Sequence, residues 1–264
     1  MIALICPTYD VMRMKRYTEI TLHSFFVTTP EAVAIVVDDG SKDWTETYEQ
    51  ELIAIAAGYN KPMHIIHFEK NGGLTRSWNC GLTKAAQLNV DYAIAGNNDI
   101  IFTPDWYRGL IAATDKGFAL VGPLSNAPGT TAAGKQEVQR YLPNYQLSDE
   151  PEVLKKQAAF LQDKYAGKTI TTLINGFFQF ARMDSWLQGK YSTDFFYKPS
   201  NPFRSNGRRN PTPLMTMNED ELQARWAKKQ MKSAIALDSF IFHYRSVTRG
   251  TKFLKGLWYR NVKN

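Results

Sequence analysis

The chain has 264 residues, 44% of them hydrophobic and 22% charged, which is the composition of a globular protein and excludes a disordered or fibrous one. No apolar run reaches the roughly 18 residues that a membrane-spanning helix needs, and no basic segment typical of a secretory signal precedes the first apolar run, so we expect neither feature. The only cysteines are Cys6 and Cys80, so we expect no disulfide framework, no cysteine zinc site and a cytoplasmic location, in the host if the protein is viral.

The net charge of +7 is unevenly distributed along the chain. Residues 201–264 hold 13 Lys and Arg against 4 Asp and Glu, a balance of +9, whereas residues 1–200 have a balance of −2. This asymmetry indicates an anionic partner for the last quarter: phosphates, nucleic acid or a lipid surface. A solvated basic tail is the alternative interpretation.

Short apolar runs alternate with amphipathic segments over the first 125 residues. This alternation predicts a βαβ series with a parallel sheet that is covered by helices on both faces. The expected strands are residues 2–6, 33–37, 63–68 and 92–95, and the expected helices are residues 15–27, 44–57 and 75–88.

The second half of the chain is less regular. We expect loops at 123–136 and 199–216, helices at 150–165 and 219–230, a strand pair or one long strand within 170–181, and a last strand at 234–242. The second loop is long, and loops of that length are usually functional or disordered.

Polar residues follow each expected strand of the first half. In an open parallel sheet, ligands bind outside the carboxyl ends of the strands. Carboxylates gathered there repel one another, so a cation or a hydrogen-bonding ligand is expected, although each Asp could instead cap the helix that follows it. The groups are Pro7-Thr8-Tyr9, Asp38-Asp39, Asn71-Gly72-Gly73 and Asn97-Asn98-Asp99.

Missing motifs exclude three common α/β classes. No Gly-x-Gly-x-x-Gly follows the first strand, and the chain contains neither a P-loop nor a Gly-x-Ser-x-Gly elbow. What remains is an α/β domain that binds a nucleotide or an anion through carboxylates and a metal.

The ordered series of strand-end motifs resembles the inverting family-two glycosyltransferases of the GT-A fold. The resemblance covers about residues 1–250 and also includes Asn79, Gly81, Asn218-Glu219-Asp220 and His243. It implies a Rossmann-like, mostly parallel central sheet with helices on both faces and an irregular acceptor-side part. It divides the chain into a nucleotide-sugar-binding half (1–125), an acceptor-side half with the catalytic base (126–250) and a basic segment (251–264).

The resemblance also implies roles for individual residues on the donor side. The base and ribose of a nucleotide sugar, a UDP-sugar by default, would lie against Pro7, Thr8 and Tyr9 and bond to Asp39, with Asp38 as a further acceptor. The remaining donor-side residues would be Asn71, Gly72, Gly73, Arg76, Asn79 and Asn98.

On the catalytic side, Asp99 would bind Mn²⁺ or Mg²⁺, which stabilises a departing diphosphate, and His243 would be a second metal ligand or a contact to the diphosphate. Asp220, with Glu219 beside it, would be the general base, and direct attack by the acceptor inverts the anomeric carbon. One departure concerns the metal motif, which is usually Asp-x-Asp but here is Asn97-Asn98-Asp99. Two plainer interpretations stay open: residues 218–221 also suit a helix start, and His243 also suits a core position.

The sequence leaves the acceptor open. A hydroxylated base in DNA, as in some phage enzymes that resemble this fold, is one candidate, and a glycan, a lipid-linked sugar or a protein is the other. Apolar residues interleaved with the C-terminal basic ones also allow peripheral membrane contact. The residues expected to bind the acceptor or its phosphates are Arg204, Arg208, Arg209, Arg245 and Arg249.

Two other function classes are alternatives to a glycosyltransferase. A nucleotide-binding module without catalysis would explain the reduced metal motif, whereas a nucleotidyltransferase would need a Gly-rich basic loop that is missing after the first strand. Structural roles are expected for His23, His64 and His67, and core positions for Trp106, Phe177, Phe178, Trp186 and Trp226.

Overall fold

The computed structural model describes residues 1–129, 134–190, 194–196 and 219–244, without the side chains of residues 219–221. Its strands are β1 (Ile2–Thr8), β2 (Ala32–Asp38), β3 (Met63–His67), β4 (Tyr92–Gly96), β5 (Ile100–Phe102), β6 (Leu120–Leu124), β7 (Thr169–Thr171), β8 (Phe178–Arg182) and β9 (Ser233–His243). Its α-helices are α1 (Val11–Thr28), α2 (Glu46–Gly58), α3 (Leu74–Gln87), α4 (Trp106–Asp115), α5 (Pro151–Tyr165), α6 (Met183–Gly189) and α7 (Glu219–Lys228). A short 3₁₀ turn covers Val138–Arg140.

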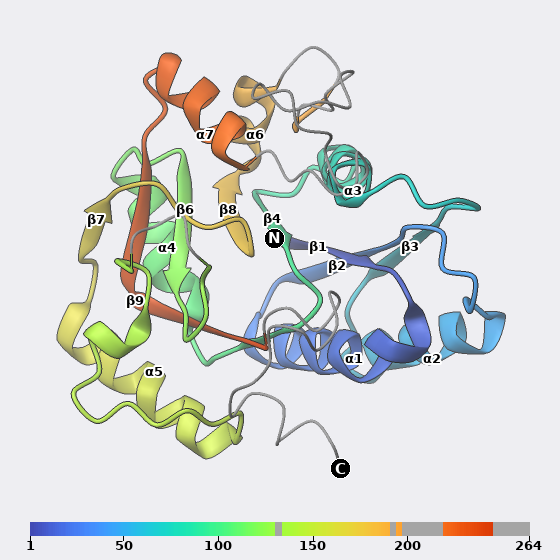
Figure 1. Ribbon diagram of the computed structural model, residues 1–264, viewed down its shortest axis with the longest axis horizontal. Coiled ribbons are helices and arrows are strands. Elements are labelled where there is room, and N and C mark those ends of the chain that lie inside the picture. Colours follow the sequence, from blue (N-terminus) through green and yellow to red (C-terminus); the bar gives the residue numbers. More distant parts are fainter. Residues whose placement is uncertain (130–133, 191–193, 197–218, 245–264) are drawn as a thin grey trace, which may run out of the picture.

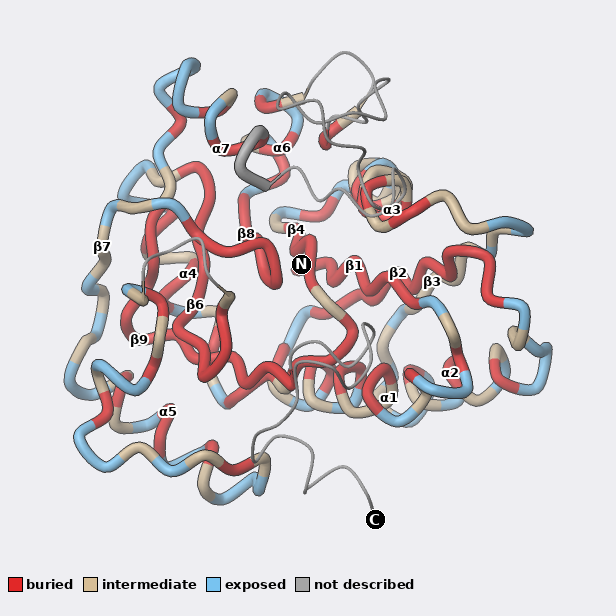
Figure 2. The backbone as a smooth tube through the Cα atoms, in the orientation of Figure 1, coloured by how far each residue is buried: buried red, intermediate tan, exposed pale blue. Residues whose placement is uncertain are grey.

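The strands form one mixed sheet in the order β3-β2-β1-β4-β8-β6-β9-β5, and β7 pairs with β9. Strands β1 to β4 are mutually parallel, with α1 and α2 on one face and α3 on the other (Figure 1). Both β1 and β2 are buried along their whole length (Figure 2), as expected of runs of Ile, Val and Ala in a sheet covered on both faces. The four strands and three helices predicted for this half are confirmed, and so is the α/β fold class.

The second half breaks the parallel pattern. Strand β8 is antiparallel to both β4 and β6, β6 is parallel to β9, and β5 and β7 are antiparallel to β9. The segment predicted as a strand pair or one strand within 170–181 is two strands that pair with other strands and not with each other. The helices predicted at 150–165 and 219–230 and the strand at 234–242 are confirmed, whereas β5, α4, β6 and α6 were not predicted. The loop predicted at 199–216 lies outside the described residues.

Hydrophobic side chains pack into a layer on each face of the sheet. One layer joins α1, α2 and α4, where Trp106 donates from its ring nitrogen to Thr29 and stacks edge-on against Phe102. The other joins α3, α5, α6 and α7 and includes Trp186 and Trp226 at 5.3 Å. The aromatic residues expected in the core are buried there. Among the described helices, none combines the length and apolar character needed to cross a membrane.

Candidate functional site

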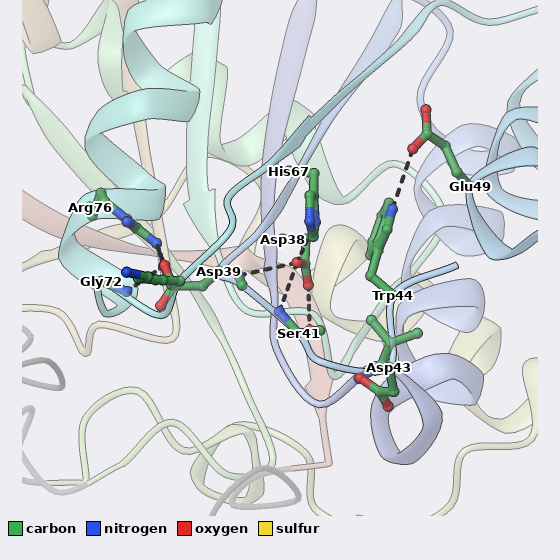
Figure 3. Close-up of polar contacts among 12 residues, drawn as sticks. Asp38, Asp39, Ser41, Asp43, Trp44, Glu49, His67, Gly72 and Arg76 are labelled. Atoms are coloured by element: carbon green, nitrogen blue, oxygen red, sulfur yellow. Dashed lines mark hydrogen bonds and ion pairs between the residues drawn. The ribbon is translucent and has the colours of Figure 1, made fainter. Parts of the chain in front are cut away.

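Asp38 lies at the carboxyl end of β2 and is completely buried. Its carboxylate accepts hydrogen bonds from the backbone N–H groups of Gly40 (3.1 Å) and Ser41 (2.9 Å), from the Ser41 hydroxyl, and from Nδ1 of His67 at 2.8 Å (Figure 3). The indole of Trp44 stacks on His67, with the ring centres 5.4 Å apart. The protein itself therefore uses the Asp38 carboxylate, which favours a structural role over contact with a nucleotide.

The neighbouring Asp39 holds the turn that precedes α3. Its carboxylate accepts from the backbone N–H groups of Gly72 (3.1 Å) and Gly73 (2.6 Å) and from Nη2 of Arg76 (2.5 Å), as Figure 3 shows in part. The Arg76 guanidinium also lies 3.8 Å from the centre of the Phe68 ring, a cation–π contact. A side chain at Gly72 would collide with this guanidinium, so a larger residue there would displace Arg76.

Gly40 joins the two aspartates to this turn. Its φ is +80°, and a Cβ there would overlap the backbone of Lys70 and Asn71. Glycine is therefore needed both for the left-handed backbone and for the close contact. The predicted donor residues Asp39, Asn71, Gly72 and Gly73 are thereby brought together at one edge of the sheet.

Asp43 occupies the N-terminus of α1. Its two carboxylate oxygens accept from the backbone N–H groups of Val11 (3.1 Å) and Met12 (2.6 Å). Free N–H groups at a helix N-terminus are a common phosphate-binding site. Here two of them already bond to a carboxylate of the protein, so the first turn of α1 does not offer that site to a diphosphate.

The end of β1 carries Pro7 and Thr8, which are buried, and Tyr9, which is 44% exposed. The amide of Asn98 points toward these strand residues and α1, donating to the Thr18 hydroxyl at 3.0 Å and lying 3.4 Å from that of Thr8. Asn98 is 5% exposed, so this amide ties β1 and α1 to the end of β4 and is held inside the protein.

Asn79 on α3 is similarly engaged with protein. Its Oδ1 accepts from the backbone N–H groups of Phe195 and Phe196 at 2.9 and 2.7 Å, and its Nδ2 donates to the Phe196 carbonyl at 2.9 Å. These bonds fasten residues 195–196 to α3. The amide predicted to line the donor site is thus committed to the backbone.

Asp99 and His243 meet at the opposite corner, where β4 ends and β9 ends. Oδ1 of Asp99 lies 3.2 Å from Nε2 of His243, and the two residues are 3% and 4% exposed. Nδ2 of Asn97 also lies 3.2 Å from the same nitrogen. The sheet topology accounts for this meeting, because β5 follows Asp99 directly and pairs with β9 from Ile100↔His243 onward.

The hydrogen bond at Nδ1 of His243 fixes the direction in which Nε2 points. Nδ1 lies 2.8 Å from the Ala127 carbonyl, which can only accept, so Nδ1 carries a proton and Nε2 is the ring nitrogen that faces Asp99. Metal-ligating histidines are commonly oriented by such a bond.

The pair also has suitable spacing for a metal. Two neighbouring ligands about 2.1 Å from an octahedral cation lie roughly 3.0 Å apart, close to the 3.2 Å between Oδ1 and Nε2. Within the described residues no group of three or more His, Cys, Asp or Glu side chains gathers to hold a metal. The two groups fit a divalent cation that takes its other ligands from substrate and water.

The pKa of the Cys6 thiol reflects the electrostatics of this corner. Burial raises the pKa of its thiol to about 12, and the negative charge of Asp99 contributes in the same direction. The thiol is therefore neutral near pH 7 and is no competitor for a cation.

Helix α7 is hydrogen-bonded to Ile174, in the segment whose Phe177 contacts His243. The side-chain amide of Gln223 accepts from the backbone N–H of Ile174 and donates to its carbonyl, both at 2.8 Å. Three residues later, the Phe177 ring stacks on His243 with the ring centres 4.9 Å apart. Glu219 and Asp220 are the first residues of α7, and their side chains lie outside the described part, as do Arg204, Arg208, Arg209, Arg245 and Arg249.

Sequence reasoning missed Asn126, Ala127 and Phe177, all of which contact His243. Asn126 stands in a stretch expected to be a loop, and Phe177 in one expected to be core. No sequence spacing indicates Asn126 or Phe177, because their contacts with His243 arise from the tertiary fold and not from the local sequence.

Comparisons with known proteins identify the fold and family. Three solved structures share the fold: S. aureus TarS 1-349 in complex with UDP-GlcNAc (TM-score 0.51, 15% identity), GalNAc-T7 with UDP, GalNAc and Mn²⁺ (0.58, 15%) and the mannosyltransferase PcManGT from Pyrobaculum calidifontis in complex with GDP-Man and Mn²⁺ (0.54, 11%). They align with 91%, 92% and 92% of this chain, which covers only 57%, 43% and 56% of theirs.

No curated protein sequence matches the chain. The model of the family "Glycosyl transferase family 2" matches residues 4–186, which run from β1 into α6 and include the Asp38–Asp39 and Asp99 corners. The chain therefore belongs to glycosyl transferase family 2.

Proposed function

We propose that the protein is a divalent-metal-dependent, inverting glycosyltransferase that uses a nucleotide-sugar donor, with UDP-sugars first. The observation that carries the proposal is the buried Asp99–His243 pair, a carboxylate oxygen and an imidazole nitrogen 3.2 Å apart at the carboxyl edge of the sheet. Family membership and the nucleotide sugars bound by two of the similar structures support it.

Asp99 and His243 are the residues that would hold Mn²⁺ or Mg²⁺. When bound, such a cation stabilises the negative charge on a departing nucleoside diphosphate. An imidazole ligand favours Mn²⁺ over Mg²⁺, and two of the similar structures contain Mn²⁺. The commitment of the first α1 amides to Asp43 supports the need for a cation, because the main alternative anion site at this edge is taken.

The Asp39 carboxylate supports recognition of a base that donates a hydrogen bond, as uracil does. Among the described residues, three protein donors occupy three of its roughly four acceptor positions, which leaves one position on Oδ2. The ring N–H of uracil can donate to that position. Tyr9, at the end of β1, is 44% exposed and offers a ring on which a base can stack. We therefore assign residues 1–125 to donor binding.

Asp220, with Glu219 beside it, is our candidate for the general base. Either carboxylate could take the proton of the acceptor hydroxyl as that hydroxyl attacks the anomeric carbon from the face opposite the diphosphate, which inverts its configuration. The attachment of α7 to Ile174 supports this assignment, since it links the helix to the segment in which Phe177 stacks on His243.

For the acceptor we propose a polyanion, with a hydroxylated base in DNA first. The charge balance of +9 in residues 201–264 exceeds what a metal-bound diphosphate needs. Residues 126–250 and the basic segment 251–264 would then meet the acceptor through Arg204, Arg208, Arg209, Arg245 and Arg249. Contact with DNA phosphates predicts an affinity that falls with salt, with a logarithmic slope near −0.9 per phosphate on duplex DNA.

The decisive experiment is release of UDP from UDP-sugars in the presence of Mn²⁺, with and without EDTA. The proposal predicts release that stops when the metal is chelated, and NMR of the transferred sugar should show inverted configuration. Duplex DNA and anionic vesicles, titrated over a range of salt, then separate a DNA acceptor from peripheral membrane contact.

A second candidate is a nucleotide-binding module without catalysis. It is favoured by the reduced motif Asn97-Asn98-Asp99, in which Asn97 stands in place of the first carboxylate and Asp99 alone remains. Nucleotide binding without UDP release from any UDP-sugar would support it over the first proposal.

A further inference from the structure

Three protein groups hold His243 besides its partners at Nε2. The Asn126 side chain brackets its backbone: Oδ1 accepts from the His243 N–H at 2.7 Å, and Nδ2 donates to the His243 carbonyl at 3.0 Å. Ala127, the next residue, accepts from Nδ1 at 2.8 Å. The Phe177 ring lies nearly parallel to the imidazole, with an angle of 16° and ring centres 4.9 Å apart.

These contacts restrict each way in which the imidazole could move. Backbone displacement would break the two Asn126 bonds, rotation about the Cβ–Cγ bond would break the Ala127 bond, and tilting would collide with or leave the Phe177 ring. Asn126 is itself held, since its carbonyl accepts from Gln139 at 3.0 Å and its side chain is buried. Such a support exceeds what a histidine that merely fills the core requires.

We propose that Asn126 and Phe177 are positioning residues that hold the His243 ring with Nδ1 on the Ala127 carbonyl and Nε2 facing Asp99. The inference rests on the proposed function for its consequence, because the position of Nε2 matters for a cation held between Asp99 and His243. The positioning itself is a property of the chain alone, so it can be tested separately.

The first test is nitrogen-15 NMR of the histidine side chains at about pH 8, where an ordinary imidazole is neutral. Loss of signals in His243→Gln identifies His243. In the wild-type protein we expect a protonated Nδ1, because the Ala127 carbonyl accepts from it. Asn126→Ala and Phe177→Leu should each give a mixture of tautomers. The control is Gln157→Ala, which removes a buried amide on α5 that bonds to the Gln146 carbonyl, and it should keep the wild-type tautomer.

The second test is the affinity for Mn²⁺ alone, measured by electron paramagnetic resonance of the free ion. Loss of outer-shell support typically weakens metal binding about 10–100-fold, which is the range we expect for both variants, with no change in Gln157→Ala. Circular dichroism checks folding, and if Asn126→Ala does not fold, Phe177→Leu decides.

Wild-type tautomer and wild-type Mn²⁺ affinity in folded Asn126→Ala and Phe177→Leu would overturn the inference. If the wild-type protein binds no Mn²⁺, the metal part of the proposed function fails instead. The tautomer measurement then still decides whether Asn126 and Phe177 position His243.

Discussion

Two acidic corners, Asp38–Asp39 and Asp99–His243, lie along the same edge of the sheet, and the hydrogen bonding of their carboxylates differs. At the first, Asp38 and Asp39 accept hydrogen bonds from backbone N–H groups, a hydroxyl, an imidazole and a guanidinium (Figure 3). At the second, the Asp99 carboxylate is equally buried, but among the residues that the structure describes its one partner is Nε2 of His243.

The difference separates acids that build the site from acids that are available to a ligand. A buried carboxylate with several protein donors has little capacity for another partner, whereas one with a single weak partner is costly to bury unless a cation or donor joins it. Sequence position cannot make this distinction, because all three aspartates follow a strand. The following predictions test it, from the largest expected effect to the smallest.

Asp99→Ala should cause the largest loss of function. If Asp99 helps to hold a cation that stabilises the leaving group by several kcal/mol, transfer should fall by about 10³-fold or more. The free energy of unfolding should change little, since no backbone N–H group of the described residues donates to the Asp99 carboxylate. Activity is measured as UDP release across a Mn²⁺ titration, and the melting temperature serves as the control. Wild-type rates at every Mn²⁺ concentration would place Asp99 with the structural acids.

Asp220→Asn extends the comparison to an acid outside both corners. As the general base, its loss should lower kcat by about 10²–10⁴-fold. Donor affinity, measured by calorimetry with UDP and Mn²⁺, should stay the same, because the amide keeps the size and polarity of the side chain. Glu219→Gln is the matched variant. A normal kcat in Asp220→Asn together with a reduced one in Glu219→Gln would move the base to Glu219.

Asp38→Ala should show the opposite pattern, with a loss of stability. Its removal leaves the buried N–H groups of Gly40 and Ser41 without their acceptor, and each such group costs about 1–3 kcal/mol. We therefore expect the free energy of unfolding in urea to fall by about 3 kcal/mol. The kcat of the folded fraction should change far less than in Asp99→Ala. A large loss of kcat at unchanged stability would remove the distinction between the two corners.

The smallest effect concerns Cys6, which lies on β1 between the corners. With a pKa of about 12, only about one thiol in 10⁴ is ionised near pH 8, and burial further blocks reagents. In native protein, a disulfide reagent should therefore modify Cys80 and leave Cys6 unmodified, whereas both react in guanidinium. Cys80→Ser provides the protein with a single thiol. Rapid reaction of Cys6 in that native variant would mean that the Asp99 corner opens to solvent.

The sequence predicted the parallel half of the fold well, because β1 to β4 are continuous apolar runs separated by helices with clear periodicity. It missed β5, which has only three residues, and β6, whose Gly122 and Pro123 are poor strand formers. Both exist because β9 pairs with them, and a partner more than 100 residues away leaves no mark on local sequence.

The candidate site divides in the same way. Aspartates after strands could be found by position, and Asp99 with His243 by resemblance. That Asp38 is saturated, that Asn79 and Asn98 serve the interior and that Asn126 supports His243 depends on tertiary contacts. The roles of Asp220, Glu219 and the C-terminal arginines stay predictions.

The place of β9 has a consequence for synthesis on the ribosome. Asn97 and His243 are 146 positions apart, so at about 5–20 residues per second His243 is made roughly 7–30 s after the motif it faces. During that interval β1 to β4 can pair, since their contacts are complete within the first hundred residues. The nascent chain can therefore form the Asp38–Asp39 corner before the Asp99–His243 corner exists. The insertion of β9 between β6 and β5 brings the imidazole to Asp99, so the pair that we propose to hold a cation forms late in synthesis.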